Sequence, residues 1–258
     1  MGSSPWAGGR YESVGERIAV IAEQTVAAAD RRQPLRGATV VDLACGTGSA
    51  ALAAAVRGAE VTGVDLTSEL IAIAEQKAAA AGHAVSWVTA DAADTGLPSG
   101  AFDAAVSNMG IIFVEPNRQV AEISRLLKPL ATLAISSWVR ADGNPFFNPI
   151  VAVLGAPPKA EFTPDQWGDP ALVKSRLAAD FTDVDIRPGT FTWRFPSLDD
   201  ALHFMEHESP IHVDVFRRAD HVQRDRLVAA FRAALAAHDD GTGVGFDSPY
   251  VVVTATRR

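Results

Sequence analysis

Nine residues decide the fold of this 258-residue chain, and they read Val40-Val41-Asp42-Leu43-Ala44-Cys45-Gly46-Thr47-Gly48. The apolar start of this run is typical of a buried strand, and the small residues at its end predict a tight turn. A helix is predicted directly after the turn, from about Ser49 to Arg57. Because small side chains let a ligand approach the backbone, the run predicts a strand, a ligand-binding turn and a helix.

The segments around this run alternate between strand-like and helix-like patterns. The predicted strands are 38–43, 60–64, 85–88, 102–107 and 131–138, and the predicted helices between them are 49–57, 68–81 and 116–127. Such alternation is typical of a parallel sheet with right-handed crossovers and helices on both faces. Ligands of these sheets bind at the carboxyl ends of the strands, so we expect the functional site there.

The remaining segments are predicted to flank or interrupt one α/β domain. A leading helix over 10–29 lies in a predicted N-terminal helical cap segment, 1–35, and residues 36–258 form the domain. Lid insertions are predicted at about 140–170 and 197–247, where Pro, Gly and Asp interrupt the pattern. The other predicted elements are helices at 171–179, 198–206 and 221–237 and extended pieces at 182–187, 190–195 and 250–256.

Composition excludes several classes of function. Acidic residues outnumber basic ones by 31 to 23, which gives a net charge of −8 and disfavours nucleic acid as a partner. The single cysteine, Cys45, cannot form an internal disulfide. No segment reaches the roughly 18 apolar residues of a membrane span. We therefore expect a cytoplasmic protein without a membrane span.

The glycine turn also satisfies the loose dinucleotide fingerprint, as Gly46-x-Gly48-x-x-Ala51. Asp42, however, places a carboxylate at the strand tip, where a pyrophosphate would meet a negative charge. A cationic ligand would be favoured at the same place. The residues therefore favour a cationic ligand and leave a nicotinamide dinucleotide as an alternative.

Polar residues also follow the next three predicted strands. Asp65 ends the second strand, where one carboxylate suits two vicinal hydroxyls, although it could instead cap the helix that begins at Ser68. Asp91 follows the third strand, either in a ligand site or in a solvated loop, and Asn108 follows the fourth. Trp87 is expected in the strand core or beside the ligand.

Together these stretches resemble motif I and the following motifs of the class I S-adenosylmethionine-dependent methyltransferases. The variant Asp42-Leu43-Ala44-Cys45-Gly46-Thr47-Gly48 is similar to the small-molecule branch that includes the quinone-biosynthesis C-methyltransferases. The resemblance covers residues 36–138 strongly and the remainder weakly. It implies a doubly wound, seven-stranded, mainly parallel Rossmann-like sheet with helical lid insertions, in which only the last strand is antiparallel.

The resemblance also implies the cofactor, S-adenosyl-L-methionine, and the residues that bind it. Asp42 would face the methionine end of the cofactor, Asn108 would contact its methionine portion, and Ala44, Gly46 and Gly48 would give backbone clearance. Asp65 would accept hydrogen bonds from the ribose hydroxyls. Leu66 would pack on adenine, Asp91 would accept from the adenine amine, and the Ala92 amide would donate to the ring. Two departures stand out. Ala44 replaces a frequent glycine, and Leu130-Ala131 replaces a glycine pair before the fifth strand.

A histidine-rich segment lies outside these motifs. His203-Phe204-Met205-Glu206-His207 matches the inverted zinc-protease pattern, but that chemistry needs a third ligand in a dedicated context, and no metal is predicted. His207 or His212 could act as a general base, since imidazole titrates near neutral pH. The alternatives are that both are structural polar groups, or that a divalent ion orients a hydroxyl acceptor.

These observations predict methyl transfer to a small, partly apolar molecule by in-line displacement. The lid insertions contain many apolar side chains, among them Phe146, Phe147, Ile150, Val151, Val153, Leu154, Phe162, Trp167, Phe204 and Met205. Because the transferred methyl is already activated, catalysis is expected to rest on positioning and exclusion of water. An NAD(P)-dependent oxidoreductase and a non-catalytic cofactor-binding module are the alternatives, and a homodimer is left open.

Overall fold

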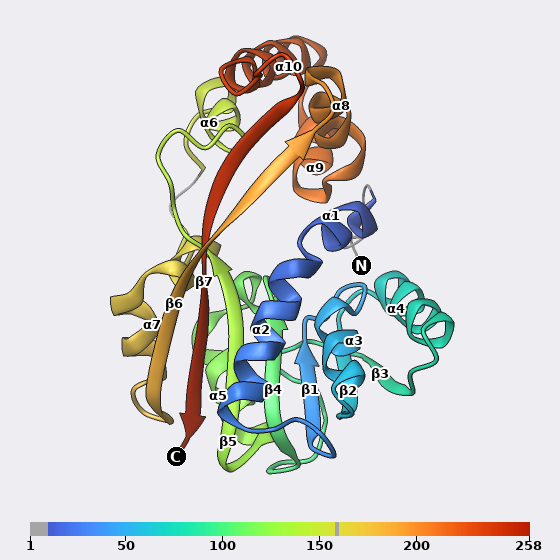
Figure 1. Ribbon diagram of the computed structural model, residues 1–258. Helices are drawn as coiled ribbons and strands as arrows, with labels where there is room; N and C mark the ends of the chain where they lie inside the picture. The colour runs from blue at the N-terminus through green and yellow to red at the C-terminus, as the bar shows by residue number, and fades with distance from the viewer. Residues whose placement is uncertain (1–9, 158–159) are drawn as a thin grey trace. The chain divides into compact units, whose positions relative to one another are not determined.

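A computed structural model describes residues 10–157 and 160–258, and their contacts divide the chain into two compact units. Unit 1 comprises the described residues of 1–14, 141–161 and 190–249, and unit 2 comprises 15–140, 162–189 and 250–258 (Figure 1). These units are defined by contacts between residues and do not test where a cap or a lid begins and ends. The cap segment and the lid boundaries inferred from the sequence therefore stay predictions.

A seven-stranded sheet forms the framework, with the strand order β3-β2-β1-β4-β5-β7-β6. The first five strands pair in parallel and β7 pairs antiparallel with β5. The strands are β1 Thr39–Leu43, β2 Glu60–Asp65, β3 Val85–Thr89, β4 Phe102–Asn108, β5 Leu127–Trp138, β6 Phe181–Phe195 and β7 Val244–Arg257. The doubly wound α/β fold predicted from the sequence is confirmed.

The crossover helices of unit 2 cover both faces of this sheet. The chain steps outward one way from β1 to β2 to β3 and the other way from β4 to β5, so right-handed crossovers place α3 and α4 opposite α5 (Figure 1). The helices with residues in unit 2 are α1 Tyr11–Arg17, α2 Ala19–Arg32, α3 Ser49–Val56, α4 Ser68–Ala80, η2 Ile111–Phe113, α5 Pro116–Leu126, η3 Pro164–Gly168 and α7 Pro170–Leu177.

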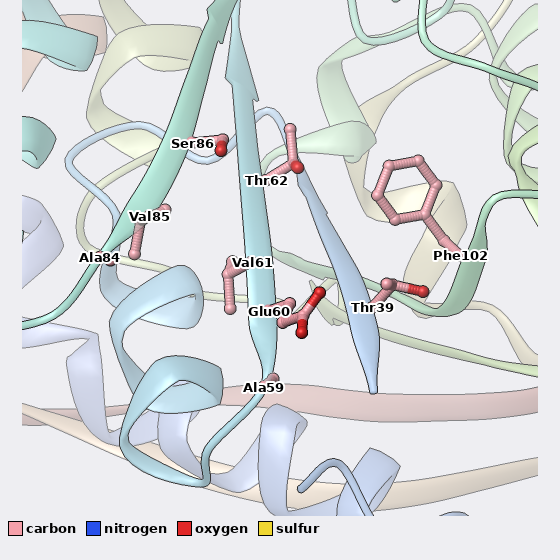
Figure 2. A pocket seen from close by; sticks show the side chains of 9 residues that line it. All are labelled: Thr39, Ala59, Glu60, Val61, Thr62, Ala84, Val85, Ser86 and Phe102. Carbon is pink, nitrogen blue, oxygen red and sulfur yellow. The ribbon is translucent and has the colours of Figure 1, made fainter. Parts of the chain in front are cut away.

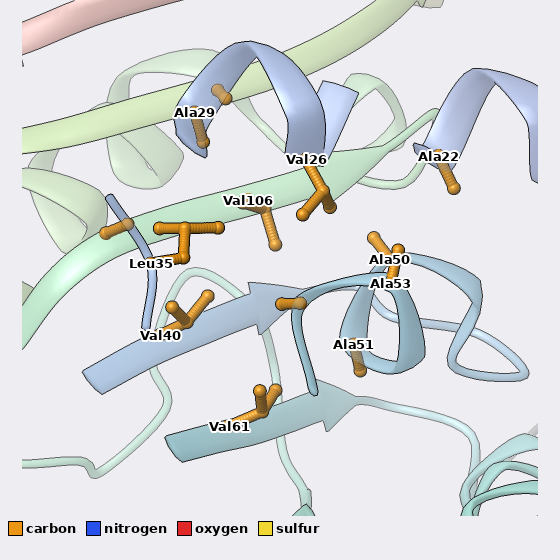
Figure 3. Close-up of a cluster of buried hydrophobic side chains, with 13 residues drawn as sticks. Ala22, Val26, Ala29, Leu35, Val40, Ala50, Ala51, Ala53, Val61 and Val106 are labelled. Carbon is orange, nitrogen blue, oxygen red and sulfur yellow. The ribbon is translucent and has the colours of Figure 1, made fainter. Parts of the chain in front are cut away.

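Small side chains bring α2 and α3 close to the sheet. Ala50, Ala51 and Ala53 of α3 are buried in one cluster with Val26 of α2 and Val40 of β1 (Figure 3). Alanine leaves little side-chain bulk between helix and strand, so the backbones approach closely and the void-free packing of a core is kept. This packing fixes the position of the turn that joins β1 to α3.

Unit 1 has a separate, aromatic core around Phe146. The ring centroid of Phe146 lies 5.0 Å from that of Trp193, 4.7 Å from that of Phe246 and 5.3 Å from that of His212. Besides the start of α1, the helices of this unit are α6 Asn148–Leu154, α8 Leu198–His203, the π-helical η4 Phe204–Glu208, α9 Pro210–Arg218 and α10 His221–Ala236. Among all described residues, no helix has the length and apolar character needed to cross a bilayer.

Several elements differ from the sequence prediction. β5 begins at Leu127 and β7 at Val244, each earlier than predicted. The two extended pieces at 182–187 and 190–195 form one strand, β6, despite Pro188. β6 lies at the edge of the sheet, where a missing N–H donor is tolerated. The leading helix is divided into α1 and α2 at Ile18, and α9 was not predicted.

Candidate active site

The turn after β1 holds its residues in left-handed backbone conformations. The φ angles are 51° at Ala44, 54° at Gly46 and 83° at Gly48. Glycine adopts this region without strain, whereas Ala44 carries a Cβ there, which explains why glycine suits that position. A Cβ on Gly110 would lie 2.3 Å from the carbonyl oxygen of Ala44, so the segment after β4 supports the turn by close backbone contact.

Asp42 lies buried beneath this turn with only one of its oxygens bonded. Its Oδ2 accepts a hydrogen bond of 2.8 Å from the amide of Ala51 in the first turn of α3. Its Oδ1 is buried and has no partner among the described residues. Burial raises the pKa of Asp42 to about 8, and the nearby charge of Asp65 adds to the rise. The structure thus holds an acceptor oxygen that a cation or a donor group would satisfy.

Asp65 at the end of β2 ties the turn to the neighbouring strand. Its Oδ2 accepts from the amide of Gly46 at 2.8 Å and its Oδ1 from that of Thr67 at 2.9 Å. Burial raises its pKa, and these hydrogen bonds oppose the rise. The N-cap residue of α4 is Thr67, not Asp65. Each carboxylate oxygen has a second lone pair, so Asp65 keeps acceptor capacity for a ligand hydroxyl.

These contacts bear on the dinucleotide alternative. A pyrophosphate at a strand–turn–helix site needs free backbone N–H donors. The amides of Gly46 and Ala51 already donate to carboxylates, and that of Gly48 donates to the carbonyl of Cys45. The arrangement therefore offers carboxyl groups and occupied donors, which fits a cationic nucleoside and disfavours a diphosphate.

An apolar side chain is exposed next to Asp65. Leu66 is 66% exposed, although large apolar side chains usually gain free energy from burial, and it is free to pack on a ligand ring. Trp87 belongs to the core instead. A Cβ on Gly63 would lie 2.3 Å from its ring, and one on Gly48 would lie 2.9 Å from it. Trp87 is partly buried and packs against the core cluster of unit 2, beside the glycine turn.

The residues that follow β3 and β4 lie at the same edge of the sheet. Asp65 lies opposite Thr89 in the register of β2 and β3, which brings Asp91 and Ala92 to this edge. Asp91 accepts from the amide of Ala93 at 2.9 Å and lies 3.4 Å from Arg118 Nη2. Ala92 is buried. The edge therefore brings together the predicted binding residues of three neighbouring strands.

Asn108 is held in place at the tip of β4. Its Oδ1 accepts from the hydroxyl of Ser136 on β5 at 2.8 Å, and the same hydroxyl accepts from the amide of Met109 at 3.1 Å. The hydroxyl of Ser107 donates to the carbonyl of Leu43 at 2.6 Å. Ser136 could not be predicted from the sequence, because an isolated serine in a strand carries no motif.

Figure 2 shows a hollow at the opposite edge of the sheet. It encloses about 540 Å³ and is lined by residues at the amino ends of the strands, including Thr39, Glu60, Val85 and Phe102. Ligands of doubly wound sheets bind outside the carboxyl ends. Because this hollow lies at the amino ends of the strands, we do not assign the cofactor to it.

The two predicted bases, His207 and His212, lie in unit 1 in different surroundings. His207 is exposed on the π-helix η4, and its ring centroid lies 4.7 Å from that of His203. His212 is buried, with Nδ1 2.7 Å from the hydroxyl of Ser209 and Nε2 2.9 Å from the carbonyl of Phe146. Desolvation lowers the pKa of His212 to about 4. No three metal-ligating side chains gather as a group within the described residues.

Comparison with known proteins agrees with this geometry. Residues 40–130 match a family model described as a methyltransferase domain. The structure of a phosphoethanolamine N-methyltransferase 2 from Haemonchus contortus, solved with S-adenosyl-L-methionine, superposes with a TM-score of 0.56 at 18% identity, covering 90% of this chain and 52% of that one. The fold and the matched domain are those of a class I methyltransferase.

Two sequence relatives extend the comparison. An uncharacterized protein of Mycobacterium tuberculosis is 30% identical over 213 residues, which are 78% of this chain and 74% of the relative. A demethylmenaquinone methyltransferase of Thermus thermophilus is 39% identical over 99 residues, 37% of this chain and 45% of the relative. The chain belongs to the class I S-adenosylmethionine-dependent methyltransferase family, so the family and the cofactor predicted from the sequence are confirmed.

Proposed function

We propose that this enzyme transfers the methyl group of S-adenosylmethionine to a small, partly apolar molecule. The observation that carries the cofactor part is the buried carboxylate of Asp42. Its Oδ1 lacks a partner within residues 10–157 and 160–258, while its Oδ2 accepts from the Ala51 amide. A positive charge beside Asp42 would favour its ionised form and supply the missing interaction. The cofactor, when bound, supplies a methyl carbon activated by a positively charged sulfur.

The remaining binding roles follow from the edge where the strands end. Asp65 would accept the ribose hydroxyls, Leu66 would cover one face of the adenine, and Asp91 with the Ala92 amide would bind its polar edge. Asn108 would contact the methionine portion from the tip of β4. Ala44, Gly46 and Gly48 leave space for close backbone approach.

Positioning, rather than acid–base chemistry, is proposed to supply most of the catalysis. The acceptor must lie in line with the activated methyl and away from water. If the acceptor must lose a proton, His207 is the better proposed base, because its ring is exposed and His212 already uses both ring nitrogens. A His207→Ala variant would then lose about 10²- to 10⁴-fold in kcat.

The acceptor class is proposed from the aromatic and aliphatic side chains of unit 1, and a turnover screen tests it. Purified protein with labelled S-adenosylmethionine would be given phenols, quinols and sugars, and mass spectrometry would detect a product heavier by one methyl group. We expect products from apolar phenols or quinols. Methylation of sugars alone would contradict the acceptor class, and binding of cofactor without turnover on any panel member would favour the non-catalytic module.

A further inference from the structure

Residues 90–101 join β3 to β4 without a helix, and the structure describes every residue of this connection. A segment without a helix or strand must find other partners for its backbone groups. Helix α5 supplies many of them. The carbonyls of Arg125 and Leu126 accept from the amides of Gly100 and Ala101 at 2.8 and 2.9 Å, and these bonds fix the end of the connection.

Side chains of α5 hold the rest of the connection. Gln119, which is fully buried, donates from Nε2 to the carbonyl of Ala92 at 3.1 Å. Arg118 lies 3.4 Å from Asp91 at the surface. We call Arg118, Gln119, Glu122 and Arg125 the anchoring row. Residues three and four apart share a face of a helix, so these side chains reach successive points of one neighbouring segment.

Glu122 and Arg125 form the centre of the anchoring row. Glu122 Oε1 accepts from both the amide and the hydroxyl of Thr95, at 2.9 and 2.6 Å. Arg125 donates to both carboxylate oxygens of Glu122 at 2.7 Å and to the carbonyl of Leu97 at 2.7 Å. Arg125, with the Thr95 bonds, lowers the pKa of Glu122 to about 2, so the pair stays charged at neutral pH. Paired and fully bonded charges of this kind hold one geometry.

The start of this held connection is the part proposed to bind adenine. The carbonyl of Ala92 is fixed by Gln119, so the peptide groups on either side of it cannot rotate freely. The amide of Ala93 donates to Asp91 Oδ1, which fixes that carboxylate too. A site fixed before binding loses less conformational entropy when the ligand arrives.

We propose that the anchoring row sets the enzyme's preference for adenine, with Gln119, Glu122 and Arg125 acting as positioning residues. This inference rests on the proposed binding roles of Asp91 and Ala92. It assigns to α5, a helix that carries no predicted binding residue, the discrimination between a base with an exocyclic amine and a base with a carbonyl oxygen. Loosening the connection would reduce the contact with the amine more than the contacts with the ribose and the methionine.

Calorimetry with two ligands tests the inference. S-Adenosylhomocysteine and S-inosylhomocysteine differ at the position of the adenine amine. The dissociation constant of S-inosylhomocysteine divided by that of S-adenosylhomocysteine measures the preference for adenine. We expect Gln119→Leu and Arg125→Lys to reduce this ratio by about threefold to tenfold, as the loss of one hydrogen bond would. Arg232→Lys is the control matched to Arg125→Lys, because it makes the same change in an arginine that pairs with Asp199 within unit 1.

Each outcome is decisive. A ratio equal to that of the unmodified protein in both folded variants would overturn the inference, whether the affinities for both ligands stay the same or fall equally. Thermal unfolding reports whether Gln119→Leu folds, and Arg125→Lys keeps the charge beside Glu122 if it does not. Failure of the unmodified protein to bind S-adenosylhomocysteine would instead contradict the proposed function, so the two failures are distinguishable.

Discussion

Asp42 is the residue whose chemistry depends most on its surroundings. Its pKa of about 8 lies above the ordinary value of 3.8, so in the ligand-free protein it is mostly protonated at pH 7. A cationic ligand favours the ionised form. We therefore expect the affinity for S-adenosylmethionine to rise between pH 6 and pH 8, by at most about tenfold per pH unit.

Substitution of Asp42 isolates this dependence. Asp42→Asn keeps an acceptor for the Ala51 amide but removes the titration, so calorimetry should give a weaker and flatter affinity profile over the same range. The free energy of unfolding should fall with rising pH, whereas the affinity for the cofactor rises. Between pH 4 and 8 the native state of the unmodified protein binds more protons at Asp42 than the unfolded state, so its stability falls as pH rises, and Asp42→Asn should remove that part of the fall. Parallel pH profiles for both proteins would contradict this role.

Asp65 should affect cofactor affinity more directly. Asp65→Ala removes the proposed hydroxyl contacts and leaves the Gly46 amide without its acceptor. We expect a loss of about 1 to 3 kcal/mol in the binding of S-adenosylhomocysteine by calorimetry. Glu75→Ala, which removes an exposed acid from α4, is the control. A dissociation constant for Asp65→Ala equal to that of the control would refute the assignment.

At the scale of single elements, the turn after β1 depends on the segment after β4. A Cβ on Gly110 would lie 2.3 Å from the carbonyl oxygen of Ala44, and backbone there must shift. Gly110→Ala should therefore lower the unfolding temperature and weaken cofactor binding together. Gly245→Ala, whose Cβ would meet nothing closer than 3.7 Å, should do neither. Unaltered binding by a folded Gly110→Ala variant would show that the turn does not need this support.

Elements with strong local signals could be predicted from the sequence. The β1–turn–α3 unit follows from an apolar run and glycines, and α5 from Pro116 and its apolar spacing. β6 was divided because Pro188 usually ends a strand, and only its place at the sheet edge, a tertiary property, explains its continuity. α9 was missed because titratable residues in 203–214 dominate the local pattern.

The candidate active site also divides into residues with a local sequence signal and residues whose role depends on contacts with distant parts of the chain. Asp42, Asp65 and Asp91 could be proposed from the sequence because each lies near the carboxyl end of a predicted strand, and parallel strands end at one edge. Gln119 and Glu122 were not found, because their partners lie 27 positions away in the chain and no local pattern records such contacts. The two uses of His212, toward Ser209 and Phe146, could not be predicted for the same reason.

At the scale of the whole molecule, two compact units are each assembled from three separate segments. No local sequence signal marks this division, since it depends on contacts between distant parts of the chain. The net charge of −8 limits the molecule's partners further, because a surface of this sign weakly opposes strongly anionic acceptors. The acidic strand ends of unit 2 belong to the same charge pattern.

One titration tests the central claim, that the strand ends of unit 2 bind a cationic nucleoside and not a dinucleotide. The purified chain would be titrated in a calorimeter with S-adenosylmethionine, S-adenosylhomocysteine and NAD⁺ at the same pH and salt concentration. We expect saturable binding of the two nucleoside thio-compounds and much weaker binding of NAD⁺. Tighter binding of NAD⁺ than of either would contradict the account.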